Sequence, residues 1–198
     1  MTSLTINGDQ ASLRTDGLNT VADFVELIKS SIDPDHMITS ILIDGKELSD
    51  DDWRASPGQF ATSIFEIETD TTENFVVSRL IQAPDIVQAC YLDFREARKL
   101  FQQGDSADGN KVLVRAVQTF QAFFDWYGSL MELLTTEERE VFSINDVVEE
   151  ISTVCKQICQ QQLYQSWWAI GESLQNQLEP KLDELETICR GFRKQLAA

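Results

Sequence analysis

The chain has 198 residues, of which 42% are hydrophobic and 25% charged, and its formal net charge is −17. These proportions are ordinary for a globular protein and exclude wholesale disorder, and the length suits one large domain or two small ones. A surface of this sign repels phosphate backbones and anionic lipid, so we expect neither a nucleic-acid nor a membrane partner. The charge instead favours basic partners, or serves only solubility.

The sequence also bears on the compartment. No apolar run approaches the ~20 residues that a membrane-spanning helix needs, and the segment MTSLTINGDQ has no basic stretch followed by a hydrophobic one. We therefore expect a cytoplasmic protein. Reduced thiols suit that compartment, and the chain has four cysteines: Cys90, Cys155, Cys159 and Cys189.

In chain order, a β-hairpin is predicted first, in the segment SLTINGDQASLR. Leu4 and Ile6 alternate with polar residues, Asn7 and Gly8 supply a turn that accepts positive φ, and Leu13 lies on the returning strand.

A helix is expected next, in the segment VADFVELIKSSI, followed by two more strands. Thr20 is a suitable N-cap, and Phe24, Val25 and Ile28 form a buried stripe before an Asp-Pro pair ends the helix. The strands are ITSILIDGKEL, with a hairpin turn in its Asp-Gly pair, and ATSIFEIET after a polar stretch that contains three successive aspartates. One helix lying across four or five strands buries all of these faces.

This order of elements resembles the ubiquitin-like β-grasp fold over residues 2–70, and SILIDGKELSDDDW is similar to ubiquitin's strand, its Gly-Lys turn and the following loop. The resemblance implies docking of partners through an apolar patch on the sheet. Leu42 falls on one patch position, and we name Leu42 and Ile64 as candidate partner-binding residues, although Glu66 stands where the patch needs an aliphatic side chain. Conjugation through a free Gly-Gly end is excluded, because the last strand runs into TDTTENFVVS.

From Thr71 onward the hydrophobic period changes from two to about 3.6 residues. We therefore predict an α+β protein, with a β-grasp domain at 1–70 and a bundle of long antiparallel helices at 73–198. Pro84 begins a helix that ends at Gly104, and GDSADGN is expected to be a loop. The core stripe of this helix is Val87, Cys90, Phe94, Ala97 and Phe101.

The clearest pattern in the chain predicts a second long helix, central to the bundle. Spacings of four and three alternate in its first stripe, which is Leu113, Val117, Phe120, Phe124, Tyr127, Met131 and Leu134. A second set widens the apolar face: Ala116, Phe123, Leu130 and Leu133. We expect Phe124 to be fully buried, and the aromatic residues to pack a core, because no ligand-type residue is interleaved with them.

For residues 144–198 we expect Asn145 to cap a helix whose buried face runs from Val147 or Val148 to Ile158. After a glutamine-rich interruption, the apolar positions are Leu163, Trp167, Ile170 and Leu174, then Leu182, Leu185, Cys189, Phe192 and Leu196. Pro180 either kinks one very long helix or separates two. The absence of glycine and the many helix formers around it favour the kinked helix.

The candidate metal ligands are weak. Cys155 and Cys159 lie four residues apart on one helix face and could share a metal, but no histidine lies nearby, so we expect buried core thiols at all four cysteines. His36, the only histidine, is expected to be a solvated loop residue; the alternative is a cation shared with Asp33 and Asp35.

No motif in the sequence indicates catalysis. One histidine without a serine or cysteine elbow motif gives little basis for an acyl-transfer triad, and Walker and GxGxxG loops are absent. We predict no catalytic, cofactor-binding or metal-binding residue.

The tryptophans are more informative. Adjacent helix positions diverge by ~100°, so one stripe cannot bury both Trp167 and Trp168. Trp126 poses the same problem beside Tyr127. We assign Trp167 to the core and name Trp168 and Trp126 as candidate partner-binding residues, against the alternative that a wide core or the other domain covers them.

These features favour a non-catalytic adaptor or scaffold, whose helical bundle binds a partner helix or a second copy of itself as a homodimer. Two alternatives are a chaperone of the secretion or flagellar export type, which the chain resembles in size, acidity and helical content, and an enzyme with an unrecognised carboxylate site.

Overall fold

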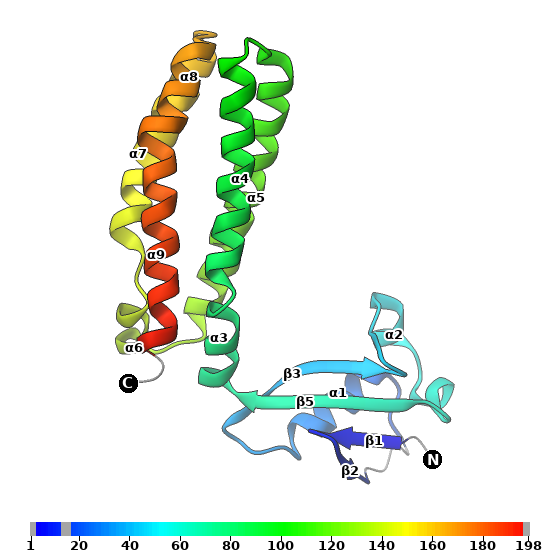
Figure 1. Ribbon diagram of the computed structural model, residues 1–198. Coiled ribbons are helices and arrows are strands. Elements are labelled where there is room, and N and C mark those ends of the chain that lie inside the picture. Colours follow the sequence, from blue (N-terminus) through cyan, green and yellow to red (C-terminus); the bar gives the residue numbers. More distant parts are fainter. Residues whose placement is uncertain (1–2, 13–16, 196–198) are drawn as a thin grey trace. The chain divides into compact units, whose positions relative to one another are not determined.

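The computed structural model describes residues 3–12 and 17–195, with side chains described as far as residue 192 (Figure 1). The predicted α+β class is confirmed, because a mixed five-stranded sheet precedes a set of helices. The chain divides into two compact units, Met1–Phe75 and Val76–Ala198, which we call the sheet unit and the helical unit. The predicted positions of Leu13 and Leu196 lie outside the described residues.

The sheet unit has the strand order β2-β1-β5-β3-β4. β1 and β5 are parallel, and the other neighbouring pairs are antiparallel. Its elements are β1 (Ser3–Ile6), β2 (Asp9–Ala11), α1 (Val21–Lys29), β3 (His36–Ile43), β4 (Lys46–Glu47), α2 (Asp50–Arg54), a 3₁₀ turn η1 (Pro57–Phe60) and β5 (Ile64–Thr71).

Both predicted hairpin turns are confirmed. Asn7 and Gly8 join β1 to β2 with φ of 51° and 83°, and Asp44 and Gly45 join β3 to β4 with φ of 52° and 74°. A two-residue turn with both φ positive matches the twist of the strands that it joins, and Asn-Gly and Asp-Gly are the pairs that adopt it most readily.

The core of the sheet unit forms as the sequence predicts. The Thr20 hydroxyl accepts from the Asp23 N–H at 3.1 Å, and the Asp23 carboxylate accepts from the Thr20 N–H at 3.0 Å, so α1 begins with a capping box. Phe24 meets Phe65 edge to face, with ring centroids 5.2 Å apart. The buried cluster is Leu4, Val21, Phe24, Val25, Ile28, Ile43, Phe65 and Ile67.

The aspartate-rich polar stretch contains the short helix α2, because Ser49 and Asp52 form a second capping box and acidic residues in a first turn are stabilised by the helix dipole. One expectation in this unit is wrong. His36 is the first residue of β3, not a solvated loop residue. Its ring is half-buried, with Nδ1 3.3 Å from the Thr69 hydroxyl.

The helical unit begins at Val76, inside α3 (Thr72–Leu80). α4 packs along α5 on one side and against α8 and α9 on the other, and α7 packs against α8 and α9 (Figure 1). No helix in the described part of the chain is long and apolar enough to cross a membrane. The remaining bounds are α4 (Ala83–Gln102), α5 (Ser106–Glu132), α6 (Thr136–Val141), α7 (Asn145–Leu163), α8 (Trp167–Ser173), a π-helical segment η2 (Leu174–Leu178) and α9 (Glu179–Gln195).

The predicted core stripe of α4 is confirmed, since all five of its residues are buried. The loop after it is shorter than expected, because Asp105 caps α5 through the Asp108 N–H and Ser106 is already helical. A Cβ at Gly109 would lie 3.0 Å from the Phe101 ring, so glycine lets α5 approach α4 closely.

The buried face of α5 is rotated from the predicted stripe. Its buried side chains are Leu113, Ala116, Phe120, Phe123, Tyr127 and Leu130, with Leu134 just beyond the helix. Phe124 is only half-buried, which contradicts the expected full burial, and Val117 is 46% exposed. α4 makes the most extensive contact with α5, and it covers a narrower face than the neighbours of a central bundle helix would.

α7 differs from expectation at both ends. Its N-cap is Ile144, and Asn145 is the first helical residue instead of the cap. Val147, Ile151 and Ile158 are buried, as predicted. Leu163 is 83% exposed, so its assignment to the apolar stripe is wrong, because α7 ends there.

Residues 167–195 form one continuous helix, so Pro180 does not separate two helices. Proline has no N–H and its ring clashes with the carbonyl four residues earlier. Just before Pro180 the helix has a wider, π-helical turn, in which the Glu179 N–H bonds to the Leu174 carbonyl. Buried residues continue through this helix: Ile170, Leu174, Leu178, Leu182, Leu185, Cys189 and Phe192.

Candidate functional site

The turn between α7 and α8 has an unusual backbone. The Gln165 N–H bonds to the Gln162 carbonyl at 3.0 Å and the Ser166 N–H to the Gln161 carbonyl at 2.9 Å, which closes a Schellman motif. Gln165 sits at the left-handed position with φ of 53°. The turn between α4 and α5 has the same bonds with Gly104 at that position, with φ of 86°. Glycine avoids the Cβ clash of this conformation, and glutamine does not.

Three large apolar side chains are exposed around this turn. Leu163 is 83% exposed, Tyr164 82% and Trp168 65%. We call these three residues the apolar tip. Trp167 lies among them but is half-buried, and its ring stacks on Phe101 with centroids 6.0 Å apart and planes within 3°. The core assignment of Trp167 therefore holds in part.

The other candidate partner-binding residues lie elsewhere. Trp126 is half-buried, with its ring 5.9 Å from Phe123, and it stands about 30 Å along α5 from the end near the tip, because a helix rises ~1.5 Å per residue. Leu42 is half-buried and Ile64 is 45% exposed on the sheet unit. Glu66 lies opposite Leu42 in the strand register, where its charge interrupts any apolar patch that would join Leu42 to Ile64.

An apolar cavity of about 220 Å³ opens between α4, α5 and α7. Its floor is buried: Phe94, Leu113 and Ile158. Its α5 wall is Val114, 50% exposed, and Val117, 46% exposed. The rest of its lining is Gln118, Cys155, Cys159 and Gln162.

We call this cavity the α5–α7 groove. At one end the Gln162 amide donates to Asn110 at 2.9 Å and ties α7 to α5. The sequence did not reveal the groove, because the regular spacing of Val117 assigned it to the core. Val114 and Val117 lie three residues apart on one helix face, beside the true buried face, and this exposed apolar pair is the signal that could have found the groove.

The two thiols of the groove differ. Cys159 is exposed, which contradicts its expected burial, and Cys155 is half-buried. Burial raises the pKa of the Cys155 thiol to about 11, with a smaller contribution from Cys159. Among the described residues, no three or more His, Cys, Asp or Glu side chains are grouped so that they could hold a metal ion.

Cys90 and Cys189 are buried core thiols, as predicted. Desolvation raises the pKa of Cys90 to about 11 and that of Cys189 to about 12. A thiol of this kind stays protonated at neutral pH and is a poor nucleophile and a poor metal ligand.

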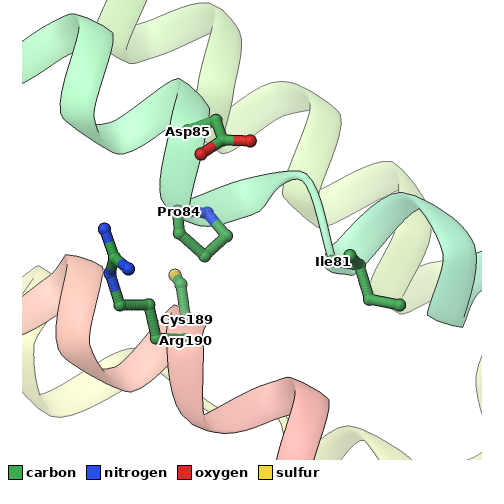
Figure 2. Close-up of a pocket in the computed structure, with 5 residues that line it drawn as sticks. All are labelled: Ile81, Pro84, Asp85, Cys189 and Arg190. Carbon is green, nitrogen blue, oxygen red and sulfur yellow. The ribbon is translucent and has the colours of Figure 1, made fainter.

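A second cavity, of about 280 Å³, lies between the start of α4 and α9 (Figure 2). Cys189 faces Pro84 across it, and Ile81, Asp85 and Arg190 complete the described lining. Arg190 is already bound to Glu186, with contacts of 2.9 and 2.5 Å. The charge of the Arg190 guanidinium is therefore offset by a carboxylate, and the protonated Cys189 thiol is a poor nucleophile.

Comparison of the chain with models of protein families, with curated proteins and with solved structures found no match. A function has therefore to be inferred from the α5–α7 groove and the apolar tip themselves.

Proposed function

We propose that the protein is a non-catalytic adaptor whose helical unit binds an amphipathic helix of another protein in the α5–α7 groove. The observation that supports this most is the exposure of Val114 and Val117 beside a buried apolar floor. Aliphatic side chains at the mouth of a concave apolar cavity are a common feature of helix-in-groove recognition.

The size of the groove favours side-chain anchors over a cofactor. Its volume of about 220 Å³ equals roughly seven water molecules at ~30 Å³ each. Drug-sized ligands and cofactors occupy ~300–1,000 Å³. Two or three aliphatic anchors fit this space, and each contributes ~1.5–3 kcal/mol when it is fully buried.

The thiol chemistry of the groove also favours binding over catalysis. A cysteine nucleophile needs a pKa lowered by nearby positive charge. The pKa of Cys155 is raised instead, chiefly by burial. Its side chain therefore acts as a small apolar group in the wall of the groove.

On this proposal the sheet unit is a ubiquitin-like β-grasp domain that supplies a second docking surface. The support is its strand order, with β1 and β5 parallel to one another, and one long helix, α1, whose apolar face lies in the core of the sheet. Partner binding here uses a mixed surface, because Glu66 lies opposite Leu42.

The groove is tested by affinity capture with matched variants. Val117→Asp places a carboxylate in the groove wall, and Val141→Asp makes the same change on α6, where the valine is 49% exposed. From an extract of the native cells, the wild type and Val141→Asp should retain a protein that Val117→Asp loses by about tenfold or more. Circular dichroism and thermal melting check that both variants fold. Equal retention by all three chains would refute the groove as the binding site.

A further inference from the structure

The apolar tip is a second surface, separate from the lining of the α5–α7 groove. It exposes three large apolar side chains within six positions, Leu163, Tyr164 and Trp168. Two of the three are aromatic side chains, which bury ~150–250 Å² each, so the tip offers on the order of 300–500 Å² of apolar surface. A patch of this size on a monomer is often functional.

The backbone conformation of the turn in the apolar tip also indicates that this surface has a function. Gln165 holds a left-handed conformation that is unfavourable for a residue with a Cβ, whereas the neighbouring turn places Gly104 at the same position. Strain of this kind is retained where the surrounding structure imposes it, and it gathers at functional sites. Here the surrounding structure is the stack of Trp167 on Phe101, which fixes the start of α8.

The face of α8 that carries Trp168 also carries a charge. Trp168 and Glu172 are four residues apart, so they are neighbours on one face of the helix. The Glu172 carboxylate accepts one hydrogen bond, from the Asn176 amide at 3.1 Å, and a carboxylate can accept several. An indole beside a carboxylate suits a cation, which can lie on the ring and pair with the acid.

A second copy of the chain suits the tip poorly. Each copy has a net charge of −17, which repels another copy and attracts a basic molecule.

The geometry points to a basic amphipathic segment of another protein as the occupant of the tip. Its apolar face covers Leu163, Tyr164 and Trp168, and a Lys or Arg lies on the Trp168 ring against Glu172. This inference does not rest on the groove, because no tip residue lines the groove.

A model peptide tests the inference on the full chain. The probe is an acetylated 14-residue peptide of leucine and lysine with the leucines at helical spacing, and a leucine–glutamate peptide of the same pattern is its control. Binding is measured by isothermal titration calorimetry at two salt concentrations. Trp168→Ala should weaken binding of the basic peptide about tenfold and Glu172→Gln about threefold, and the acidic peptide should not bind.

Leu92→Ala is the matched control, because Leu92 is 56% exposed on α4 away from the tip. It should bind the basic peptide as the wild type does, and so should Val117→Asp. Binding of the basic peptide that is unchanged in both Leu92→Ala and Trp168→Ala would show that only the overall charge attracts the peptide, and would overturn the inference. Two further results would also overturn it: a dimer in sedimentation that Trp168→Ala abolishes, or binding of phosphatidylcholine vesicles that depends on Trp168. Melting curves confirm that each variant is folded.

Discussion

The Trp167 ring lies parallel to the Phe101 ring, with the planes within 3° and the centroids 6.0 Å apart. This stack ties the start of α8 to the end of α4. Because consecutive residues of a helix point ~100° apart, it also turns Trp168 away from the core, and Trp168 is 65% exposed.

The two tryptophans should therefore respond differently to truncation. Trp167→Ala removes the stack and should lower the free energy of unfolding by ~2–4 kcal/mol. Trp168→Ala should change it by less than ~0.5 kcal/mol, as an exposed substitution does. Urea unfolding of both variants measures the difference. Equal losses would mean that Trp168 also belongs to the core.

The observed buried face of α5 allows a second comparison of two neighbouring residues, Phe123 and Phe124. Phe123 is 2% exposed and contacts four aromatic neighbours, whereas Phe124 is half-buried. Phe123→Ala should cost ~3–5 kcal/mol of stability, and Phe124→Ala less than half as much. Chemical denaturation of the two variants checks the order, and a larger loss at Phe124 would restore the stripe expected from sequence alone.

The elements that the sequence predicted correctly depend on local rules. Asn7 with Gly8, Asp44 with Gly45, and the Thr20 cap each act over four residues or fewer, so their conformation can be read from the residues themselves.

The register of α5 and the groove could not be read in this way. The apolar arc of α5 is wider than the face that α4 covers, and only the tertiary arrangement decides that Phe123 faces inward and Val117 outward. Leu163 was assigned to the stripe that follows the glutamine-rich interruption, because its spacing of four to Trp167 fits a helix. The break lies instead after Leu163, at a turn that has glutamine where glycine normally marks the end of a helix.

Relief of strain in the tip should be measurable. Gln165→Gly removes the Cβ from the left-handed position and should raise the free energy of unfolding by ~0.5–1 kcal/mol. Gly104→Ala introduces a Cβ at the equivalent position of the other turn and should lower it by a similar amount. Thermal melting of the pair provides the test. A destabilised Gln165→Gly variant would show that the glutamine side chain is held by contacts that outweigh the strain.

Alkaline pH should destabilise the fold through groups that burial keeps protonated. Burial raises the pKa of Cys189 from 9.0 to about 12 and that of Tyr127 from 10.0 to about 12. The Tyr127 hydroxyl also donates a hydrogen bond to the Phe142 carbonyl oxygen, at 2.5 Å. Because the folded state holds these protons more tightly than the unfolded state does, their contribution is complete below pH 9 and is lost as the pH rises through 9–12.

Once the pH exceeds the pKa that a group has in the unfolded state, that group should lower the free energy of unfolding by about 1.4 kcal/mol per pH unit. Urea unfolding at a series of pH values measures it. Cys189→Ala should start from a lower stability and show a shallower decline above pH 9, since one of the titrating groups is gone. An unchanged slope would assign the decline to other groups.

The central claim is that a partner helix lies in the α5–α7 groove, and site-specific photo-crosslinking tests it most directly. A photoreactive phenylalanine is placed at Val117, in the groove wall, or at Val141, a valine of similar exposure on α6. After irradiation in the native cells, the chain with the probe at Val117 should give one discrete crosslinked species, and the chain with the probe at Val141 should not. Crosslinks of equal yield from both positions, or none from Val117, would contradict the claim.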